Sequence, residues 1–250
     1  MNVDSDNIEK LQKAVEVAEN IVFFGGAGVS TESGIPDFRS QDGLYKQEYE
    51  YPPEEIVSHS FLTGKSEEFY KFYKKKMLSP YAEPNAAHRK LAEMEKKGKL
   101  KAIITQNIDG LHEKAGSKNV IDIHGSVLRN YCCKCHRRPS EDGIPYIKRI
   151  SSAPGIPKCE YCGGMMRPDV VLYEESLDYA KIQRAVEYIS KADLLIIGGT
   201  SLVVYPAAGF IDYFNGKCLA VINMDSTSRD NQADILIKGK IGEVLSDIKV

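Results

Sequence analysis

Short runs of apolar residues recur along the chain and predict the strands of a buried sheet. The clearest runs cover residues 21–24, 101–105, 194–197 and 219–222, and each is rich in Ile, Val, Leu or Phe. Continuous apolar runs of this length are typical of strands that are covered on both faces. We therefore expect these segments to be neighbouring strands of one parallel sheet.

Segments with apolar residues at helical spacing alternate with these runs. The spacing predicts helices over residues 5–19, 66–77, 85–97, 178–190 and 206–215. Strands that alternate with helices indicate a parallel sheet with helices on both faces. The expected fold class is α/β, with a doubly wound parallel sheet.

Two stretches interrupt this alternation. Residues 126–168 contain four paired cysteines, basic residues and many Pro and Gly, and residues 40–84 are rich in Tyr and Lys. We interpret the first as a zinc-ribbon module and the second as a helical insertion, which together form a small domain. The large domain is then expected to comprise residues 1–39, 85–125 and 169–250.

Charge and composition narrow the classes of protein. The chain has 250 residues, and 33 Lys and Arg against 35 Asp and Glu give a formal net charge of -2. This balance offers no bulk attraction to nucleic acid or to an anionic membrane. No segment approaches the roughly 20 uninterrupted apolar residues of a membrane span, and the N-terminus lacks the pattern of a secretory signal. We expect a cytoplasmic protein that binds neither a membrane nor a specific nucleic acid.

The paired cysteines predict a metal site. Cys132 and Cys135 form one C-x-x-C motif, and Cys159 and Cys162 form a second one 23 residues later. Two such pairs can place four thiolates in a tetrahedron, which is the arrangement of structural zinc sites. The alternatives are a redox pair or cysteines that are merely buried. A four-cysteine site leaves no position for water, so the expected role of this zinc is structural.

A glycine-rich turn follows the first apolar run. Gly26 and Gly28 stand directly after residues 21–24, but Thr31 occupies the place of the third glycine of the dinucleotide-binding pattern. The turn can present backbone N–H groups to a phosphate, or it can be a plain tight turn.

Polar side chains also follow the other apolar runs. Ligands of open α/β sheets gather at the carboxyl ends of the strands, so a binding site is favoured there. His124 stands at the junction with the cysteine module, where clefts form between domains. The residues after the runs are Gln106, Asn107, Asp109, Thr200, Ser201, Asn223 and Asp225.

These segments together resemble a known family. GAGVSTESGIPDFRS, TQNIDGLH, IHGS, the two C-x-x-C pairs, GGTSLVVYPA and INMD stand in the order found in the sirtuin family of NAD-dependent protein deacylases. The resemblance implies a Rossmann-like large domain, a small zinc domain with one zinc per chain, and a cleft for NAD and an acyl-lysine peptide. It also implies the reaction, in which the acetyl group of acetyl-lysine passes to ADP-ribose. Nicotinamide, O-acetyl-ADP-ribose and free lysine are released.

The resemblance assigns roles residue by residue. His124 matches the general base, and Asn107 and Asp109 match residues that orient the nicotinamide end of NAD and its ribose. The residues that match the NAD pocket are Gly26, Ala27, Gly28, Thr31, Ile35, Asp37, Phe38, Arg39, Gln106, Asn107, Ile108, Asp109, His124, Thr200, Ser201, Asn223 and Ile241. The zinc ligands would be Cys132, Cys135, Cys159 and Cys162. The segments expected to pair with the substrate peptide contribute Val170, Val171, Leu172, Tyr173, Leu202 and Val203.

The chain departs from the family pattern at two places. Many relatives carry VFFGE where residues 171–175 read VLYEE, and a backbone-paired peptide should tolerate this change. Members that remove succinyl groups carry Tyr-x-x-Arg, whereas this chain has Tyr70 and Tyr73 at the matching positions. We therefore expect acetyl and other neutral acyl groups to be preferred, although Lys74, Lys75 and Lys76 follow directly.

Three other functions are compatible with parts of this pattern. An ADP-ribosyltransferase could use the same NAD pocket, and a sensor could hold NAD or ADP-ribose without turnover. A zinc-ribbon nucleic-acid module is disfavoured by the net charge. The combination of Asn107, Asp109 and His124 favours catalysis over sensing.

Overall fold

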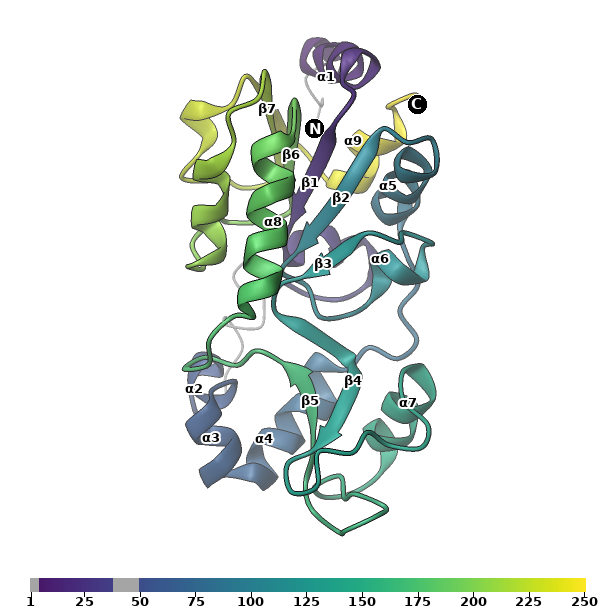
Figure 1. Cartoon of the computed structure of the whole chain (residues 1–250), viewed down its shortest axis with the longest axis vertical. Coiled ribbons are helices and arrows are strands. Elements are labelled where there is room, and N and C mark those ends of the chain that lie inside the picture. Colours follow the sequence, from purple (N-terminus) through teal and green to yellow (C-terminus); the bar gives the residue numbers. More distant parts are fainter. Residues whose placement is uncertain (1–4, 38–49) are drawn as a thin grey trace.

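A computed structural model of the protein describes residues 5–37 and 50–250 (Figure 1). Its centre is a parallel sheet of six strands in the order β3-β2-β1-β6-β7-β8. The strands are β1 (Ile21–Gly25), β2 (Leu100–Thr105), β3 (Val120–Asp122), β6 (Leu194–Gly198), β7 (Cys218–Asn223) and β8 (Ile235–Lys238). The order reverses next to β1, which places the first strand of the chain at the middle of the sheet.

Helices cover both faces of this sheet because its strands are apolar on both sides. Ile21 and Phe23 pack into the cluster on one face, and Val22 and Phe24 pack into the cluster on the other. The first face carries α1 (Ser5–Val17), α5 (Ala86–Lys96) and α9 (Ile241–Ser246), and the second carries α8 (Tyr179–Lys191) and the 3-10 helix η5 (Ala207–Tyr213). The doubly wound α/β fold predicted from the sequence is confirmed.

A second lobe lies beyond the carboxyl ends of the central strands (Figure 1). Its antiparallel pair consists of β4 (Gly125–Cys132) and β5 (Met166–Val170). Around this pair lie α2 (Pro53–Ile56), α3 (His59–Gly64), α4 (Ser66–Phe72), the π-helical turn η4 (Tyr73–Met77) and α7 (Ile144–Ser152). One hydrophobic cluster joins residues from both stretches of the chain, for example Phe69 and Tyr146. The segments 53–78 and 127–172 therefore share a core, and their assignment to a separate small domain stays a prediction.

Short elements complete the chain. The glycine-rich turn contains the 3-10 helices η1 (Ala27–Val29) and η2 (Thr31–Ser33), α6 (Leu111–Lys114) follows β2, and η6 (Asp230–Gln232) precedes β8. Among the described helices, α1 and α8 are the longest, with 13 residues each. Within residues 5–37 and 50–250, no helix combines the length and the apolar character that a membrane crossing would require.

Two helix predictions differ from the structure. Residues 206–215 were predicted to form an α-helix, but Ala207–Tyr213 form a 3-10 helix that ends before Phe214. The stretch 66–77 is α-helical only to Phe72, and its last turn is a π-helix. Gly209 lies within η5 and Gly216 just after it, and glycine lowers the tendency to continue an α-helix.

Candidate functional site

A cavity of about 830 Å³ lies between the six-stranded sheet and the second lobe. One side is formed by the segments that follow β1, β2, β6 and β7, where ligands of parallel α/β sheets bind. The other side is formed by residues 170–175 together with Val57, Lys76 and Met77. The volume suits a ligand of the size of a nucleotide cofactor with part of a second substrate.

Most of the residues assigned from the sequence line this cavity. They are Ala27, Gly28, Thr31, Ile35, Asp37, Gln106, Asn107, Ile108, Asp109, His124, Thr200, Ser201, Asn223 and Ile241, together with Val170, Val171, Leu172 and Tyr173. Phe38 and Arg39 lie outside the described residues. Gly26, Leu202 and Val203 do not line the cavity, and Asp225, which the sequence singled out less firmly, does.

The glycine-rich turn is held against the loop after β6. The Gly28 N–H donates to the carbonyl oxygen of Gly199 at 2.8 Å. A Cβ atom at position 28 would lie 2.8 Å from the Gly199 Cα, and one at position 26 would lie 2.8 Å from the Thr200 Cβ. Both glycines are therefore required by close packing of two loops. Gly26 packs against Thr200 outside the cavity, and Gly28 also lines the cavity.

Hydrogen bonds among three polar side chains join the glycine-rich turn after β1 to the loop after β2. The Ser30 hydroxyl donates to Asp109 Oδ2 at 2.7 Å, and the Asn107 amide donates to Ser30 Oγ at 3.0 Å. Burial raises the pKa of Asp109, whereas hydrogen bonds from the Leu111 N–H and from Ser30 act in the opposite direction. Ser30 was not among the residues assigned from the sequence. Its place within GGAGVS, one residue before Thr31, was the available signal.

Gln106 connects three of the strand ends. Its backbone N–H donates to Gly25 at 2.9 Å, and its side-chain amide donates to Thr200 Oγ1 at 3.0 Å. Its carbonyl oxygen lies 3.0 Å from His124 Nδ1. A carbonyl only accepts hydrogen bonds, so the proton of a neutral His124 is assigned to Nδ1 and Nε2 is left as the acceptor.

The surroundings of His124 favour its neutral form. Burial lowers the pKa of His124 from its ordinary value of 6.5, the bond to Gln106 raises it, and the nearby Lys181 lowers it. An uncharged imidazole with Nε2 available can accept a proton near neutral pH. The candidate base therefore has both the tautomer and the protonation state that general-base catalysis needs.

The segment after β5 is hydrogen-bonded to His124 at one end and to the start of α3 at the other. The Val171 N–H donates to the carbonyl oxygen of His124 at 2.9 Å. The Tyr173 N–H donates to Val57 at 3.0 Å, and the His59 N–H donates to Tyr173 at 3.0 Å. Residues 171–173 thus form an extended wall of the cavity that is attached to both lobes.

The loop after β6 places its side chains differently from expectation. Leu202 is buried in the hydrophobic cluster beneath α8, with a positive φ of 55°, and Val203 is exposed. Val204 and Tyr205 line the cavity instead. The left-handed backbone at Leu202 turns this side chain inward, which the apolar sequence of the loop did not indicate.

The tyrosines that were compared with an acyl-gripping pair lie in the core of the second lobe. Tyr70 and Tyr73 are 1% and 0% exposed, and the Tyr70 hydroxyl donates to the carbonyl oxygen of Met166. Neither tyrosine lines the cavity. The argument for a neutral acyl group therefore cannot rest on Tyr73, and the residues of this helix that do line the cavity are Lys76 and Met77.

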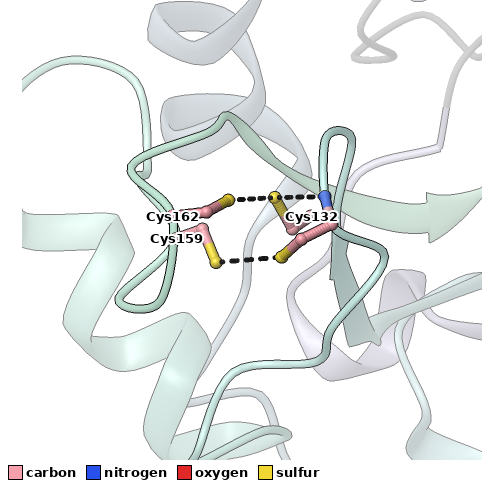
Figure 2. Close-up of side chains that lie close together, drawn as sticks. Cys132, Cys159 and Cys162 are labelled. Atoms are coloured by element: carbon pink, nitrogen blue, oxygen red, sulfur yellow. Dashed lines mark hydrogen bonds between the residues drawn. The ribbon is translucent and has the colours of Figure 1, made fainter.

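The four paired cysteines converge at one point, as Figure 2 shows for Cys132, Cys159 and Cys162. All four Sγ atoms lie within 4.8 Å of one another. The distances are 3.5 Å from Cys132 to Cys162 and 3.7 Å from Cys135 to Cys159. A tetrahedron with Zn–S bonds of about 2.3 Å has S···S edges of about 3.8 Å, whereas a disulfide needs about 2.05 Å. The cluster therefore fits a four-thiolate zinc site and does not contain disulfides.

Most of the chain matches one known protein family. A model described as the Sir2 family matches residues 26–206, which include the glycine-rich turn, both cysteine pairs and the loop after β6. The chain belongs to the Sir2 family. The family resemblance predicted from the sequence is confirmed.

The similarity to named Sir2-family proteins extends over nearly the whole chain. A protein of Clostridium perfringens (strain 13 / Type A) named NAD-dependent protein deacetylase is 57% identical over 97% of this chain and 98% of its own length. A protein of Cutibacterium acnes (strain DSM 16379 / KPA171202) with the same name is 49% identical over 96% and 97%.

Solved Sir2 structures have the same fold as this chain. A Sir2 homologue in complex with NAD superposes with a TM-score of 0.82, at 41% identity over 96% of this chain and 91% of its own. A Sir2 variant with a deacetylated p53 peptide and 3'-O-acetyl ADP ribose gives a TM-score of 0.86, at 35% identity over 95% of each chain.

Proposed function

We propose that this chain is an NAD-dependent protein lysine deacetylase. It transfers the acetyl group of acetyl-lysine to ADP-ribose and releases nicotinamide, O-acetyl-ADP-ribose and free lysine. The observation that carries this proposal is that His124 lines the same cavity as Ser30, Asn107 and Asp109, which are hydrogen-bonded to one another. The named relatives and the Sir2 structures with NAD and peptide support the same activity.

The NAD site is assigned to the strand-end side of the cavity. The N–H groups of Gly26, Gly28, Val29 and Ser30 are bonded within the protein, so those of Ala27 and Thr31 are the ones that suit the phosphates. Thr200, Ser201 and Asn223 suit the adenosine half because they follow β6 and β7. Asn107 and Asp109 orient the nicotinamide end from the end of β2. When bound, NAD supplies the ribose carbon that accepts the acyl oxygen, with nicotinamide as the leaving group.

His124 acts as the general base in this proposal. Its Nδ1 proton is held by the Gln106 carbonyl, so Nε2 accepts a proton from a ribose hydroxyl. Water then completes the release of free lysine and O-acetyl-ADP-ribose. Because His124 is neutral near pH 7, no prior proton loss is needed before this step.

The peptide is proposed to lie along residues 171–173 as an added strand. Among the described residues, neither the carbonyl of Val171 nor the N–H of Glu174 makes a hydrogen bond, and both residues line the cavity. These groups give an extended peptide one acceptor and one donor. The acyl-lysine would then enter between this segment and the end of β2.

Zinc is proposed to hold the second lobe without entering the reaction. Cys132, Cys135, Cys159 and Cys162 would complete a tetrahedral site and leave no place for water. The domain division and the cytoplasmic location stay predictions.

One experiment tests the activity and separates it from its alternatives. The protein is incubated with NAD and an acetyl-lysine peptide, and the products are identified by mass spectrometry. Deacetylation predicts nicotinamide, deacetylated peptide and O-acetyl-ADP-ribose in equal amounts. An ADP-ribosyltransferase would instead leave ADP-ribose on protein, and a sensor would return NAD intact, so either result would reject the proposal.

A further inference from the structure

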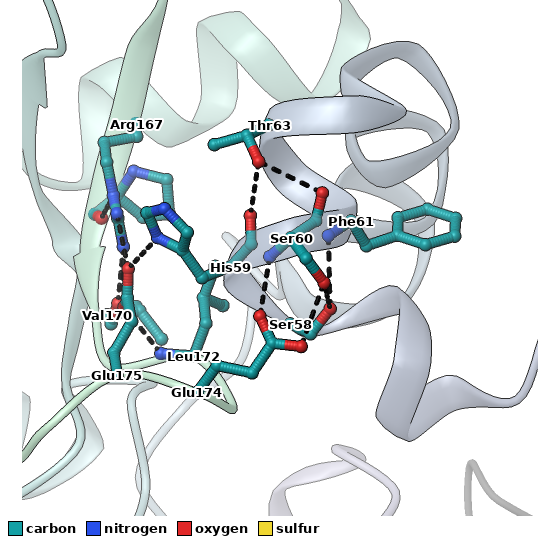
Figure 3. Close-up of polar contacts among 11 residues, drawn as sticks. Ser58, His59, Ser60, Phe61, Thr63, Arg167, Val170, Leu172, Glu174 and Glu175 are labelled. Carbon is teal, nitrogen blue, oxygen red and sulfur yellow. Dashed lines mark hydrogen bonds and ion pairs between the residues drawn. The ribbon is translucent and has the colours of Figure 1, made fainter.

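An ion pair joins Arg167 of β5 to Glu175 in the turn that follows this strand (Figure 3). Glu175 accepts from Arg167 Nη1 at 2.7 Å and from Nη2 at 3.0 Å. The same carboxylate accepts the backbone N–H of Leu172 at 2.9 Å. The position of Leu172, in the middle of the segment 171–173, therefore depends directly on this pair.

Arg167 is fixed by further contacts. It is 9% exposed, its Nη2 donates to the carbonyl of Val170 at 3.0 Å, and its Nε donates to Pro168 at 3.3 Å. The planar guanidinium can satisfy all these acceptors only in one orientation. Burial raises the pKa of Glu175, but hydrogen bonds from Arg167, Leu172 and His59 lower it to about 2. The pair is therefore charged on both sides at neutral pH.

A second carboxylate holds the other side of the same turn. Glu174 has a φ of 74°, in the left-handed region that non-glycine residues rarely adopt. Its carboxylate accepts the backbone N–H and the hydroxyl of Ser60, both at 2.9 Å. The turn is thereby attached to the first residues of α3, as Figure 3 shows.

All three N–H groups of the segment are used for this attachment. Val171 donates to the carbonyl of His124, Leu172 donates to Glu175, and Tyr173 donates to Val57. Of the three, only the Leu172 bond goes to a side chain. A change in Glu175 or Arg167 can therefore move the middle of the segment while both ends stay attached.

We propose that Arg167 and Glu175 are positioning residues for the peptide substrate. They fix the backbone of residues 171–173, along which the acyl-lysine peptide lies, by holding the Leu172 amide. This inference rests on the proposed deacetylase function. The hydrogen bonds and ion pair of Arg167 and Glu175 go to residues outside the set assigned to NAD, so the pair acts on the peptide and leaves NAD binding largely unchanged.

If Arg167 and Glu175 only stabilised the fold, a different result would be expected. Breaking a buried ion pair from one side leaves an unpaired charge, whereas removing both charges relieves that penalty. The double variant Arg167→Met/Glu175→Met removes both charges and the acceptor of the Leu172 N–H, and it should therefore recover much of the thermal stability that either single variant loses. A positioning role requires that its peptide affinity stays low despite this recovery.

The test measures kinetics and peptide binding in Arg167→Lys, Glu175→Met and the double variant. We expect the KM for acetyl-peptide and the Kd of a fluorescent acetyl-peptide to rise about tenfold to a hundredfold, as misplacement of a substrate contact does. The KM for NAD should change by less than about threefold, because neither Arg167 nor Glu175 bonds a residue assigned to NAD.

The matched control is Asp212→Asn, which breaks the Arg229–Asp212 ion pair of 2.6 Å outside the cavity. It should leave peptide binding within about twofold of wild type, as surface substitutions usually do. If wild type shows no deacetylation, the proposed function itself fails. If wild type is active, normal peptide affinity in the double variant, or equal changes for peptide and NAD, overturns the positioning role.

Discussion

At His124, the carbonyl of Gln106 and the burial of the ring together prepare one nitrogen for proton transfer. We expect His124→Ala to lose roughly 10²–10⁴-fold in the rate of deacetylation, the usual contribution of a positioned base. Binding of NAD and peptide should persist because other residues provide those contacts. Labelled nicotinamide and acetyl-peptide in one assay separate the steps, and nicotinamide exchange should survive better than deacetylation.

Near wild-type deacetylation by His124→Ala would show that another group is the base. Asn107→Ala serves as the comparison, since it should depress exchange and deacetylation together. Asn107 donates to Ser30, which in turn donates to the buried Asp109. Its loss disturbs the site before the first step.

The pH dependence of the rate follows from the direction of the His124 shift. Because burial lowers the pKa of His124, the base form persists below 6.5, and activity should fall only at a more acidic pH. A profile of kcat against pH checks this expectation. An acid limb centred above 6.5 would contradict it.

Gly28 is required by its close contact with the loop after β6. A Cβ there would lie 2.8 Å from the Cα and 2.9 Å from the oxygen of Gly199, both backbone atoms that cannot rotate away. We expect Gly28→Ala to lower the free energy of unfolding by about 1–3 kcal/mol and to weaken NAD binding. Gly64→Ala is the control, because a Cβ at position 64 meets nothing within 4 Å. Urea unfolding of both variants makes the comparison, and equal effects would reject the packing argument.

At the scale of elements, the cysteine cluster joins the end of β4 to the loop before β5. We expect Cys159→Ala to lose the bound zinc, to loosen the second lobe and to abolish activity, because structural zinc supplies much of such a module's stability. Metal analysis, near-ultraviolet circular dichroism and the deacetylase assay are the measurements. Cys133→Ala is the matched control, since this exposed thiol lies between two ligands in sequence. Full zinc content in Cys159→Ala would contradict the assignment.

The central strands could be predicted from the sequence because they are continuous apolar runs. The predicted runs 21–24 and 194–197 each differ from β1 and β6 by a single terminal glycine. The strands β4 and β5 were not predicted, since they contain Arg129, Asn130, Arg167 and Asp169 and lack regular alternation. The short strands β3 and β8 have three and four residues, too few for a periodic signal.

The candidate site was predictable on its sheet side only. Polar residues after parallel strands meet at one edge by geometry, which brings Gln106, Thr200 and Asn223 together. Val57, Lys76 and Met77 enter the cavity through the packing of the second lobe. That packing depends on contacts between distant segments, and no local pattern indicates it.

For the whole molecule, two buried histidines make stability depend on pH. His88 and His112 are 0% and 1% exposed, with ring centroids 4.7 Å apart. Burial lowers the pKa of His88 to about 4, and burial followed by the charge of His88 lowers the pKa of His112 well below 6.5. Both rings therefore stay neutral in the folded state at a pH where the unfolded chain takes up protons.

The sign of the effect follows from this difference. Stability is fullest above pH 6.5 and falls as the pH decreases from 6.5 towards 4, by up to about 1.4 kcal/mol per pH unit for each histidine. Urea unfolding at pH 7 and pH 5 measures the slope. His112→Phe should reduce it by about one proton, and an unchanged slope in this variant would exclude His112 as a source.

The contact between Gly28 and Gly199 also has a dynamic consequence. Each glycine leaves no space for a side chain on the other, and the bond from the Gly28 N–H to Gly199 crosses between their loops. Opening of either loop breaks the contact between Gly28 and Gly199, on which the closed position of the other loop also depends. We therefore expect the two loops to open together. In hydrogen–deuterium exchange, the amides of residues 26–29 and 198–200 should therefore exchange as one cooperative unit, and addition of NAD should slow both groups together.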